Sequence, residues 1–192
     1  SVLEKYYKED NENFQVKDIY AKALYIFSGL SFNVKDKKWH EYFLKSYKIY
    51  TELLKYNFLK YSKTIIELNN YFINNYNANN MFLQSEPYYK NNISLLNRQG
   101  KKGVEEKIKE ISDELFSKVL NLADKNKKIE LFFVNKRLIE YVFNFEKKYW
   151  AKYYVQKLLA LGGLLYKSNI DDKQLSIAEQ LQKEGINICE QF

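Results

Sequence analysis

The sequence predicts an all-α protein, a bundle of about six or seven helices, two of them long, that lie mostly antiparallel. Its 192 residues include six glycines and one proline, too few for the tight turns of a β-sandwich or β-barrel. Apolar residues recur at steps of three and four along most of the chain, which is the helical period. The hydrophobic fraction of 46% is enough for a core, so we expect a single bundle domain over residues 14–192.

The N-terminal segment, residues 1–13, has the mostly polar sequence SVLEKYYKEDNEN, and we expect it to form a tether or a frayed start. Helical spacing begins at Phe14, and Gly29 stands where a left-handed C-cap would end the first helix. The apolar stripe of this helix is predicted to comprise Val16, Tyr20, Ala23, Phe27 and Leu30.

Two long helices are expected. The first follows Asp36 as its N-cap, carries aromatic residues such as Trp39, and extends to Phe72 unless it breaks near Ser62. The second follows the turn ADKNKK and covers residues 125–166.

Shorter elements fill the remainder of the chain. NNYNANN, residues 74–80, predicts a loop, because asparagine side chains hydrogen-bond their own backbone. A helix within residues 80–98 is limited by Pro87, which either starts a second segment or kinks the first. After the connector 98–103, VEEKIKEISDELFSKVLNL predicts an amphipathic helix. The last helix begins behind NIDD and is expected to stop at Gly185.

The segment EKKYWAKYYVQKLLALGGLLYK, residues 146–167, mixes lysines with aromatic and aliphatic residues. On a helical wheel its large apolar side chains gather on the side of Trp150, and Lys148, Lys152 and Gln156 gather opposite. We therefore expect a core helix. A protein-binding face and an interfacial membrane helix are the alternatives. A membrane-spanning helix is not among them, because the segment is too short and too charged to span a bilayer.

No catalytic, cofactor-binding or metal-binding residues are predicted. The chain has one histidine, His40, and one cysteine, Cys189, which excludes the familiar zinc clusters and any intrachain disulfide. The carboxylate pair Glu105-Glu106 stands at a helix start, where it suits the helix dipole. Asn92-Ile93-Ser94 matches the glycosylation tripeptide. We expect a protein that is not an enzyme.

The formal net charge of +7 favours two interpretations. One is attraction to nucleic acid or to an anionic membrane. The other is coding composition, because lysine, asparagine, tyrosine, isoleucine and phenylalanine are all abundant, as AT-rich DNA would encode. Arg98 and Arg137 are the only arginines, whereas phosphate and base recognition usually uses that side chain. The candidate binding residues are the lysines Lys101, Lys102, Lys127, Lys128, Lys148 and Lys152.

Two passages carry a family resemblance, VEEKIKEISDELFSKVLNLADKNKK and NIDDKQLSIAEQLQKEGI. In style and composition they resemble the helical, plasmid-encoded surface lipoproteins of Lyme-disease-type spirochaetes. That resemblance implies a helical bundle on the cell surface, joined to the outer membrane by a polar tether and a lipid anchor outside this chain. It also implies a host protein as partner. The alternative is an intracellular basic helical protein that binds nucleic acid or an anionic membrane surface.

Overall fold

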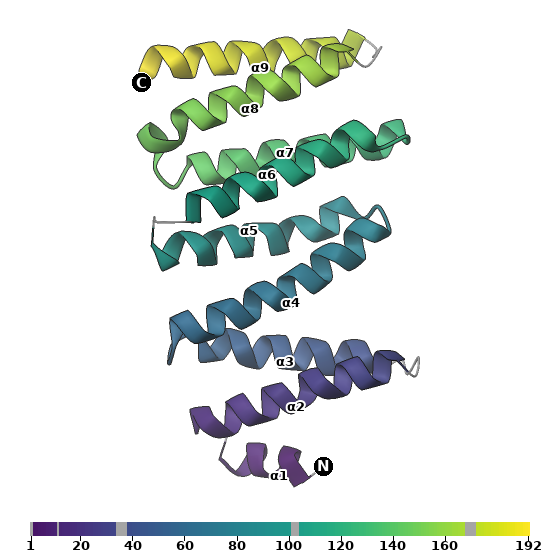
Figure 1. The fold of residues 1–192 in the computed structure, drawn as a ribbon, viewed down its shortest axis with the longest axis vertical. Coiled ribbons are helices and arrows are strands. Elements are labelled where there is room, and N and C mark those ends of the chain that lie inside the picture. The colour runs from purple at the N-terminus through teal and green to yellow at the C-terminus, as the bar shows by residue number, and fades with distance from the viewer. Residues whose placement is uncertain (1, 11, 34–37, 101–103, 168–171) are drawn as a thin grey trace. The chain divides into compact units, whose positions relative to one another are not determined.

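The computed structural model describes residues 2–10, 12–33, 38–100, 104–167 and 172–192, and these residues form helices without any strand (Figure 1). The all-α fold class is therefore confirmed for the described part of the chain. The helices are α1 (Val2–Glu9), α2 (Phe14–Asn33), α3 (Trp39–Leu53), α4 (Phe58–Ala78), α5 (Phe82–Gln99), α6 (Val104–Asn121), α7 (Lys125–Phe143), α8 (Lys147–Lys167) and α9 (Asp172–Gln191).

Each of the two long helices predicted from the sequence is divided in the structure. The first breaks between α3 and α4 rather than near Ser62, and the Asn57 side chain accepts a hydrogen bond from the Lys60 amide at 3.0 Å, which caps α4. The second breaks at Asn144, whose amide closes the end of α7 on the Glu140 carbonyl. Asparagine favours such ends because its short side chain competes with helical hydrogen bonds.

Several predicted boundaries are also wrong. Helix α4 continues through most of the predicted loop at 74–80 and ends at Ala78, where the Met81 amide donates to the Tyr76 carbonyl and Asn80 takes a φ of 53°. Gly29 and Gly185 lie inside α2 and α9 rather than at their ends. The helix expected within residues 80–98 is present as α5, with Pro87 inside it rather than at the start of a second segment. The predicted caps at Asp36 and at residues 169–171 of NIDD fall outside the described residues.

Other local predictions agree with the structure. The turn before α7 is as expected, because the Asp124 side chain accepts hydrogen bonds from the amides of Asn126 and Lys127. Glu105 and Glu106 lie in the first turn of α6. In contrast, the N-terminal segment expected to be a tether or a frayed start contains the helix α1.

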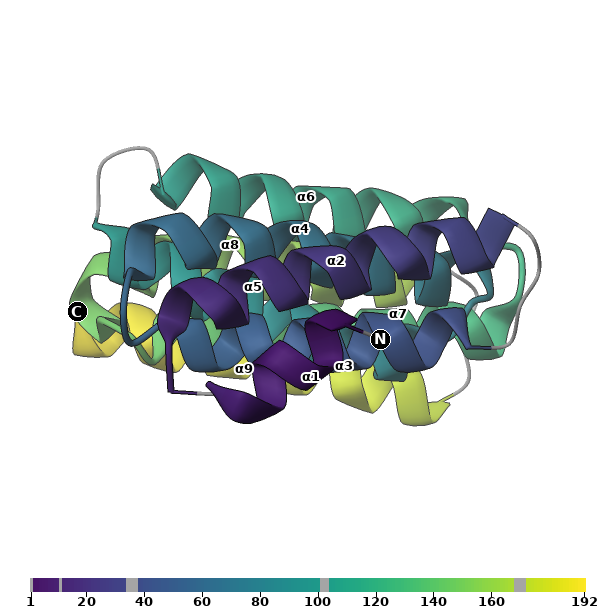
Figure 2. The same cartoon turned by 90° about the horizontal axis from the view of Figure 1, so that it is seen from below.

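Contacts within the chain group it into two compact units, residues 1–71 and residues 72–192, with the boundary inside α4. In the first unit α2 packs along α3, and α1 packs against α2 (Figure 2). The two principal helices approach closely, since the buried Ser46 hydroxyl of α3 donates to the Ala21 carbonyl of α2 at 2.8 Å. Small residues at this contact allow the backbones to lie near one another.

The buried stripe of α2 differs from the predicted one. Phe27 and Leu30 are exposed, and Val16, Tyr20 and Ala23 are only half-buried. The side facing α3 instead consists of Lys17, Ala21, Leu24 and Ser28. The prediction followed the largest apolar residues, whereas the contact selects small side chains that permit close approach.

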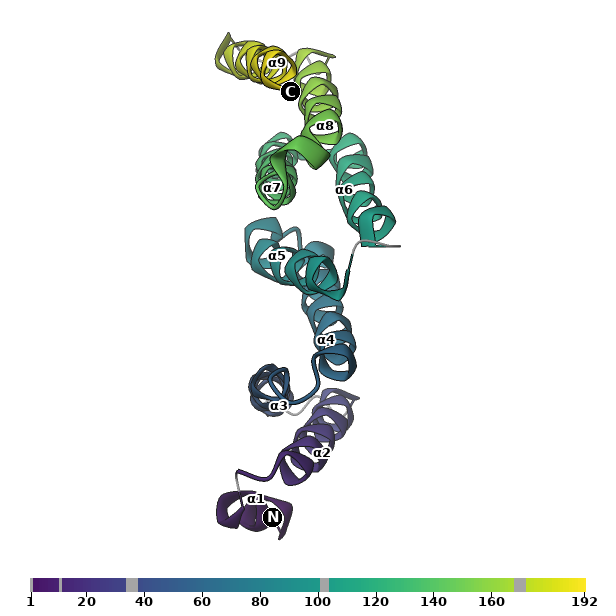
Figure 3. The same cartoon turned by 90° about the vertical axis from the view of Figure 1, so that its left-hand side faces the viewer.

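In the second unit α7 is the central helix, because α5, α6 and α8 all pack against it, and α9 packs against α8 (Figure 3). Helix α8 has the predicted orientation. Trp150 is 5% exposed, and Lys148, Lys152 and Gln156 are exposed on the other side. The core interpretation of residues 146–167 is confirmed, since the residues that share the side of Trp150 are also buried, namely Tyr154, Leu158, Leu161 and Leu165.

A partly buried ion pair joins α5 to α7. The Arg137 guanidinium donates to both carboxylate oxygens of Glu86, with its Nε 3.0 Å from each, and Lys90 lies 2.8 Å from the same carboxylate. Burial raises the pKa of the Glu86 carboxyl, but the hydrogen bonds and charges of Arg137 and Lys90 outweigh burial, so the pKa lies below its ordinary value. The carboxylate is therefore ionised at neutral pH.

Trp150→Ala should reduce the free energy of unfolding by about 3 kcal/mol or more, because it removes a large buried ring and leaves a cavity. Urea unfolding followed by circular dichroism measures this value. The matched variant Lys152→Ala, on the exposed side of the same helix, should change it by less than about 0.5 kcal/mol. Equal effects of the two variants would contradict the core position of Trp150.

Glu86→Gln should lower stability at neutral pH and also weaken its dependence on acid. A carboxyl whose pKa is lowered by folding stabilises the protein above its unfolded pKa, and this contribution is lost as the pH falls through the folded value. Urea unfolding at a series of pH values below neutral should show a shallower decline for the variant. Glu110→Gln, at an exposed position on α6, is the control and should follow the wild-type curve. If Glu86→Gln also followed the wild-type curve, the ion pair would contribute no stability.

Candidate protein-binding surface

Helix α2 exposes a stripe of aliphatic side chains on the side away from α3. Ile19, Ile26 and Leu30 are 59%, 52% and 57% exposed, and Ala23 lies between them. At about 100° per residue these four positions share one face of the helix. We call these four residues the α2 stripe. Contiguous exposed aliphatic residues are uncommon on soluble domains and mark interaction surfaces more often than single exposed ones.

A pocket of about 390 Å³ lies beside the α2 stripe, and Ile26 and Leu30 form part of its wall. Its opposite wall is aromatic. The Phe43 ring lies 4.8 Å from that of Tyr71 and 6.1 Å from that of Tyr25, and the Trp39 ring packs edge-on against Tyr71. Such a pocket suits an apolar or aromatic side chain from another molecule.

Among the residues that the structure describes, the wall of this pocket carries no ionised group at neutral pH. Burial raises the pKa of the Tyr71 hydroxyl above its ordinary value, so this side chain stays neutral. The buried Ser28 hydroxyl donates to the Tyr25 carbonyl at 2.6 Å and is therefore satisfied within α2. An entering apolar group would not compete with a buried charge.

Ion pairs hold α2 in the orientation that exposes the stripe. Lys17 is buried and lies 3.2 Å from Glu52 of α3, and Asp18 accepts from Lys60 of α4 at 2.5 Å. Burial lowers the pKa of the Lys17 ammonium, but its bond to Glu52 outweighs burial and raises the pKa above the ordinary value. Rotating α2 to bury the stripe would separate both pairs.

No known protein family, characterised protein or solved structure matches this chain. Among the described helices, none is long and apolar enough to span a membrane. The described residues likewise include no cluster of three or more histidine, cysteine, aspartate or glutamate side chains suited to a metal ion.

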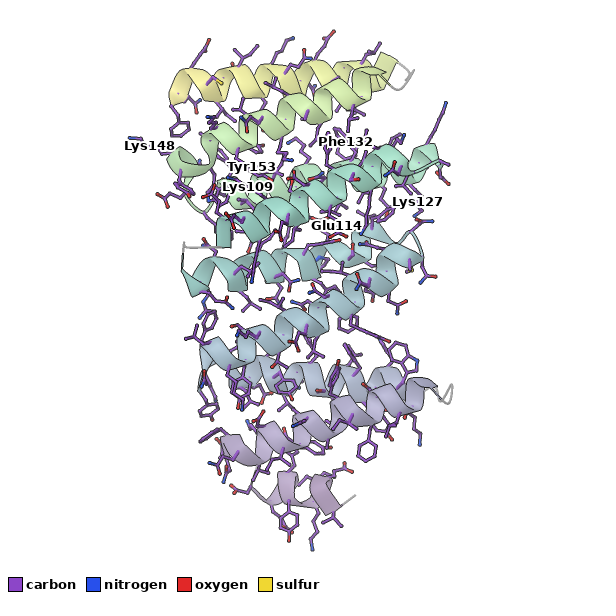
Figure 4. The ribbon with its side chains drawn as sticks, viewed as in Figure 1. Lys109, Glu114, Lys127, Phe132, Lys148 and Tyr153 are labelled. Carbon is purple, nitrogen blue, oxygen red and sulfur yellow. The ribbon has the colours of Figure 1, made fainter. Side chains whose placement is uncertain are left out.

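The lysines predicted from the sequence as a contact surface do not form one patch among the described residues. Lys127 and Lys148 lie at opposite ends of the helices of the second unit (Figure 4). Lys127 also pairs with Glu130 at 2.8 Å, and Lys128 is half-buried. Lys148 and Lys152 are exposed on α8, whereas Lys101 and Lys102 fall outside the described residues.

Carboxylates accompany much of the positive charge of α6. Lys109 pairs with Glu105, Lys118 pairs with Glu114, and Asp113 accepts from Lys157 of α8. The half-buried Tyr153 ring lies close to Lys109 (Figure 4), and the ammonium groups of Lys109 and Lys157 are 5.7 and 5.5 Å from its centroid. These pairs leave this face with little net charge for a phosphate backbone.

Three further residues noted in the sequence, Asn92, Cys189 and His40, lie on α5, α9 and α3. Asn92, the acceptor position of the glycosylation tripeptide, is buried in α5, where an oligosaccharide would not fit. Cys189 is exposed on α9, and His40 packs its ring edge-on against Trp39 on α3.

Leu24→Ala should cost about 2 to 5 kcal/mol of stability, because Leu24 is buried against α3. Leu30→Ala should change stability by about 0.5 kcal/mol or less, because Leu30 belongs to the exposed α2 stripe. Urea unfolding of both variants makes the comparison with the same substitution on the same helix. A larger loss for Leu30→Ala would show that the stripe is covered in solution.

Proposed function

We propose that this chain is a non-catalytic helical binding protein that contacts a host protein through the α2 stripe and its neighbouring pocket. The observation that carries the proposal is the exposure of Ile19, Ile26 and Leu30 beside an aromatic pocket. Protein interfaces derive most of their binding energy from a few apolar or aromatic side chains that fill such pockets. The pairing of Lys109, Lys118 and Lys157 with carboxylates supports a protein partner over nucleic acid.

We further propose that the protein is displayed on a cell surface, as the outer-membrane lipoproteins it resembles in composition are. Its membrane attachment would be a lipid anchor outside this chain, and its role would be host interaction and virulence. Antiparallel pairing of its helices belongs to the same proposal, since short connectors join helices that pack together, as in α2 with α3 and α8 with α9.

Binding to purified host serum and matrix proteins, measured by surface plasmon resonance, tests the proposed partner. Ile26→Asp should weaken binding roughly tenfold or more, because it places a charge in the apolar contact. Ile186→Asp, the same substitution at an exposed position of α9, is the matched control and should bind as the wild type does. Equal loss in both variants, or in neither, would contradict the assignment of the α2 stripe.

Salt dependence separates this proposal from the alternative of an intracellular basic protein. A contact made by apolar side chains should lose little affinity as salt rises, whereas one made to several phosphates should lose about a thousandfold or more. Steep loss of affinity for nucleic acid or anionic vesicles as salt rises would favour the alternative.

Protease accessibility on intact source cells tests the proposed display on the cell surface. Full protection of the protein, like that of a cytosolic control, would overturn the proposed display.

A further inference from the structure

A second pocket, of about 470 Å³, lies within the second unit and is lined mainly by polar side chains. The end of α4, the start of α5 and the second half of α6 form it, with Glu114 projecting from α6 (Figure 4). The polar lining residues are Asn77, Asn80, Glu114, Ser117, Lys118 and Asn121. The buried Phe82 ring and Leu122 supply its apolar part.

The Asn77 amide leaves one buried polar atom without a partner at this pocket. Its Nδ2 donates to the hydroxyl of the buried Tyr89 at 2.8 Å, and its Oδ1 is buried with no hydrogen-bond partner. If the amide were turned over, Tyr89 would donate to the oxygen and the nitrogen would be the atom left over. In either orientation one polar atom of the Asn77 amide, a residue of the pocket lining, is left without a hydrogen-bond partner.

Three further polar side chains in the pocket lining have hydrogen-bonding groups available to a ligand. Ser117, Asn121 and Asn80 make no side-chain hydrogen bond to the described residues, although all three line the pocket. Asn80 is held there by its left-handed backbone, with a φ of 53°, at the turn between α4 and α5. Amide and hydroxyl groups both donate and accept, so together they match a ligand with several hydroxyl groups.

The charges of the pocket cancel. Lys118 lies 2.5 Å from Glu114, its neighbour one helical turn earlier, and these two residues are the only ionised groups in the pocket lining described here. A neutral lining does not concentrate phosphates, carboxylates or amines, because none of these would find an unpaired opposite charge. The lining therefore favours an uncharged ligand over an ionic one.

We propose that this pocket binds a neutral polyhydroxylated ligand, a sugar residue, through Asn77, Ser117 and Asn121. The proposal combines the buried unpaired amide atom of Asn77, the uncommitted amide and hydroxyl groups, and the internally neutralised charge. The pocket volume falls within the range of small-molecule sites. The pocket shares no lining residue with the pocket beside the α2 stripe, so the proposal stands independently of the proposed protein partner.

The test is a titration of the full chain, labelled with nitrogen-15, against glucose, galactose, mannose and N-acetylglucosamine at millimolar concentrations. At least one sugar should cause saturable shifts in the asparagine side-chain amide signals. The double variant Ser117→Ala, Asn121→Ala should weaken binding of that sugar roughly tenfold or more, because each side chain supplies a hydrogen bond to the ligand. Asn97→Ala, an exposed position on α5 outside the pocket, should bind as the wild type does.

Three outcomes would overturn the proposal. One is the absence of saturable shifts with all four sugars, and the second is equal affinity of the double variant and the wild type. The third is saturable binding at the pocket of phosphate or glycine alone, which would show that its charges are not neutralised. The double variant should unfold in urea as the wild type does, since neither side chain has a partner among the described residues.

Discussion

The burial of helix α7 is the constraint on which the second unit depends. Three helices cover α7, so residues on several of its sides are buried, including Leu131, Phe132, Val134 and Phe143. Such a helix gains stability only when all of its neighbours are in place. The Glu86–Arg137 ion pair adds direction to this apolar contact, because its two-pronged geometry favours one alignment of α5 on α7. No intrachain disulfide is possible in a chain with one cysteine, so packing has to maintain the unit.

The first unit solves a different problem with α2, a helix whose apolar residues cover more of its circumference than one neighbour can bury. Helix α3 takes the side that carries Ala21 and Ser28, because small side chains allow the closest approach. The pairs Lys17–Glu52 and Asp18–Lys60 then keep that side inward. The aliphatic side that remains exposed is the basis for the proposed protein contact.

Charge has a largely internal role in the part of the second unit that the structure describes. Several lysines of α6 and α7 pair with carboxylates of the same helix or of another helix, as Lys109 does with Glu105 and Lys136 with Glu184. Exposed pairs of this kind contribute little stability, but they reduce the field that would attract a phosphate backbone. The net charge of +7 is therefore a weak guide to a partner. A neutral lining such as that made by Glu114 and Lys118 favours an uncharged ligand instead.

The fold class, the amphipathic helix α6, the turn at Asp124 and the inward face of α8 could be predicted from the sequence, because each depends on residues close to one another along the chain. The buried face of α2 could not, since small residues at a close contact leave a weaker pattern than large apolar ones. The tertiary structure also determines which side of α2 stays exposed, the Lys157–Asp113 pair and the polar pocket. The exposed side depends on the helix that packs against α2, and the pair and the pocket join residues distant in the sequence, so the period of one helix carries no record of them.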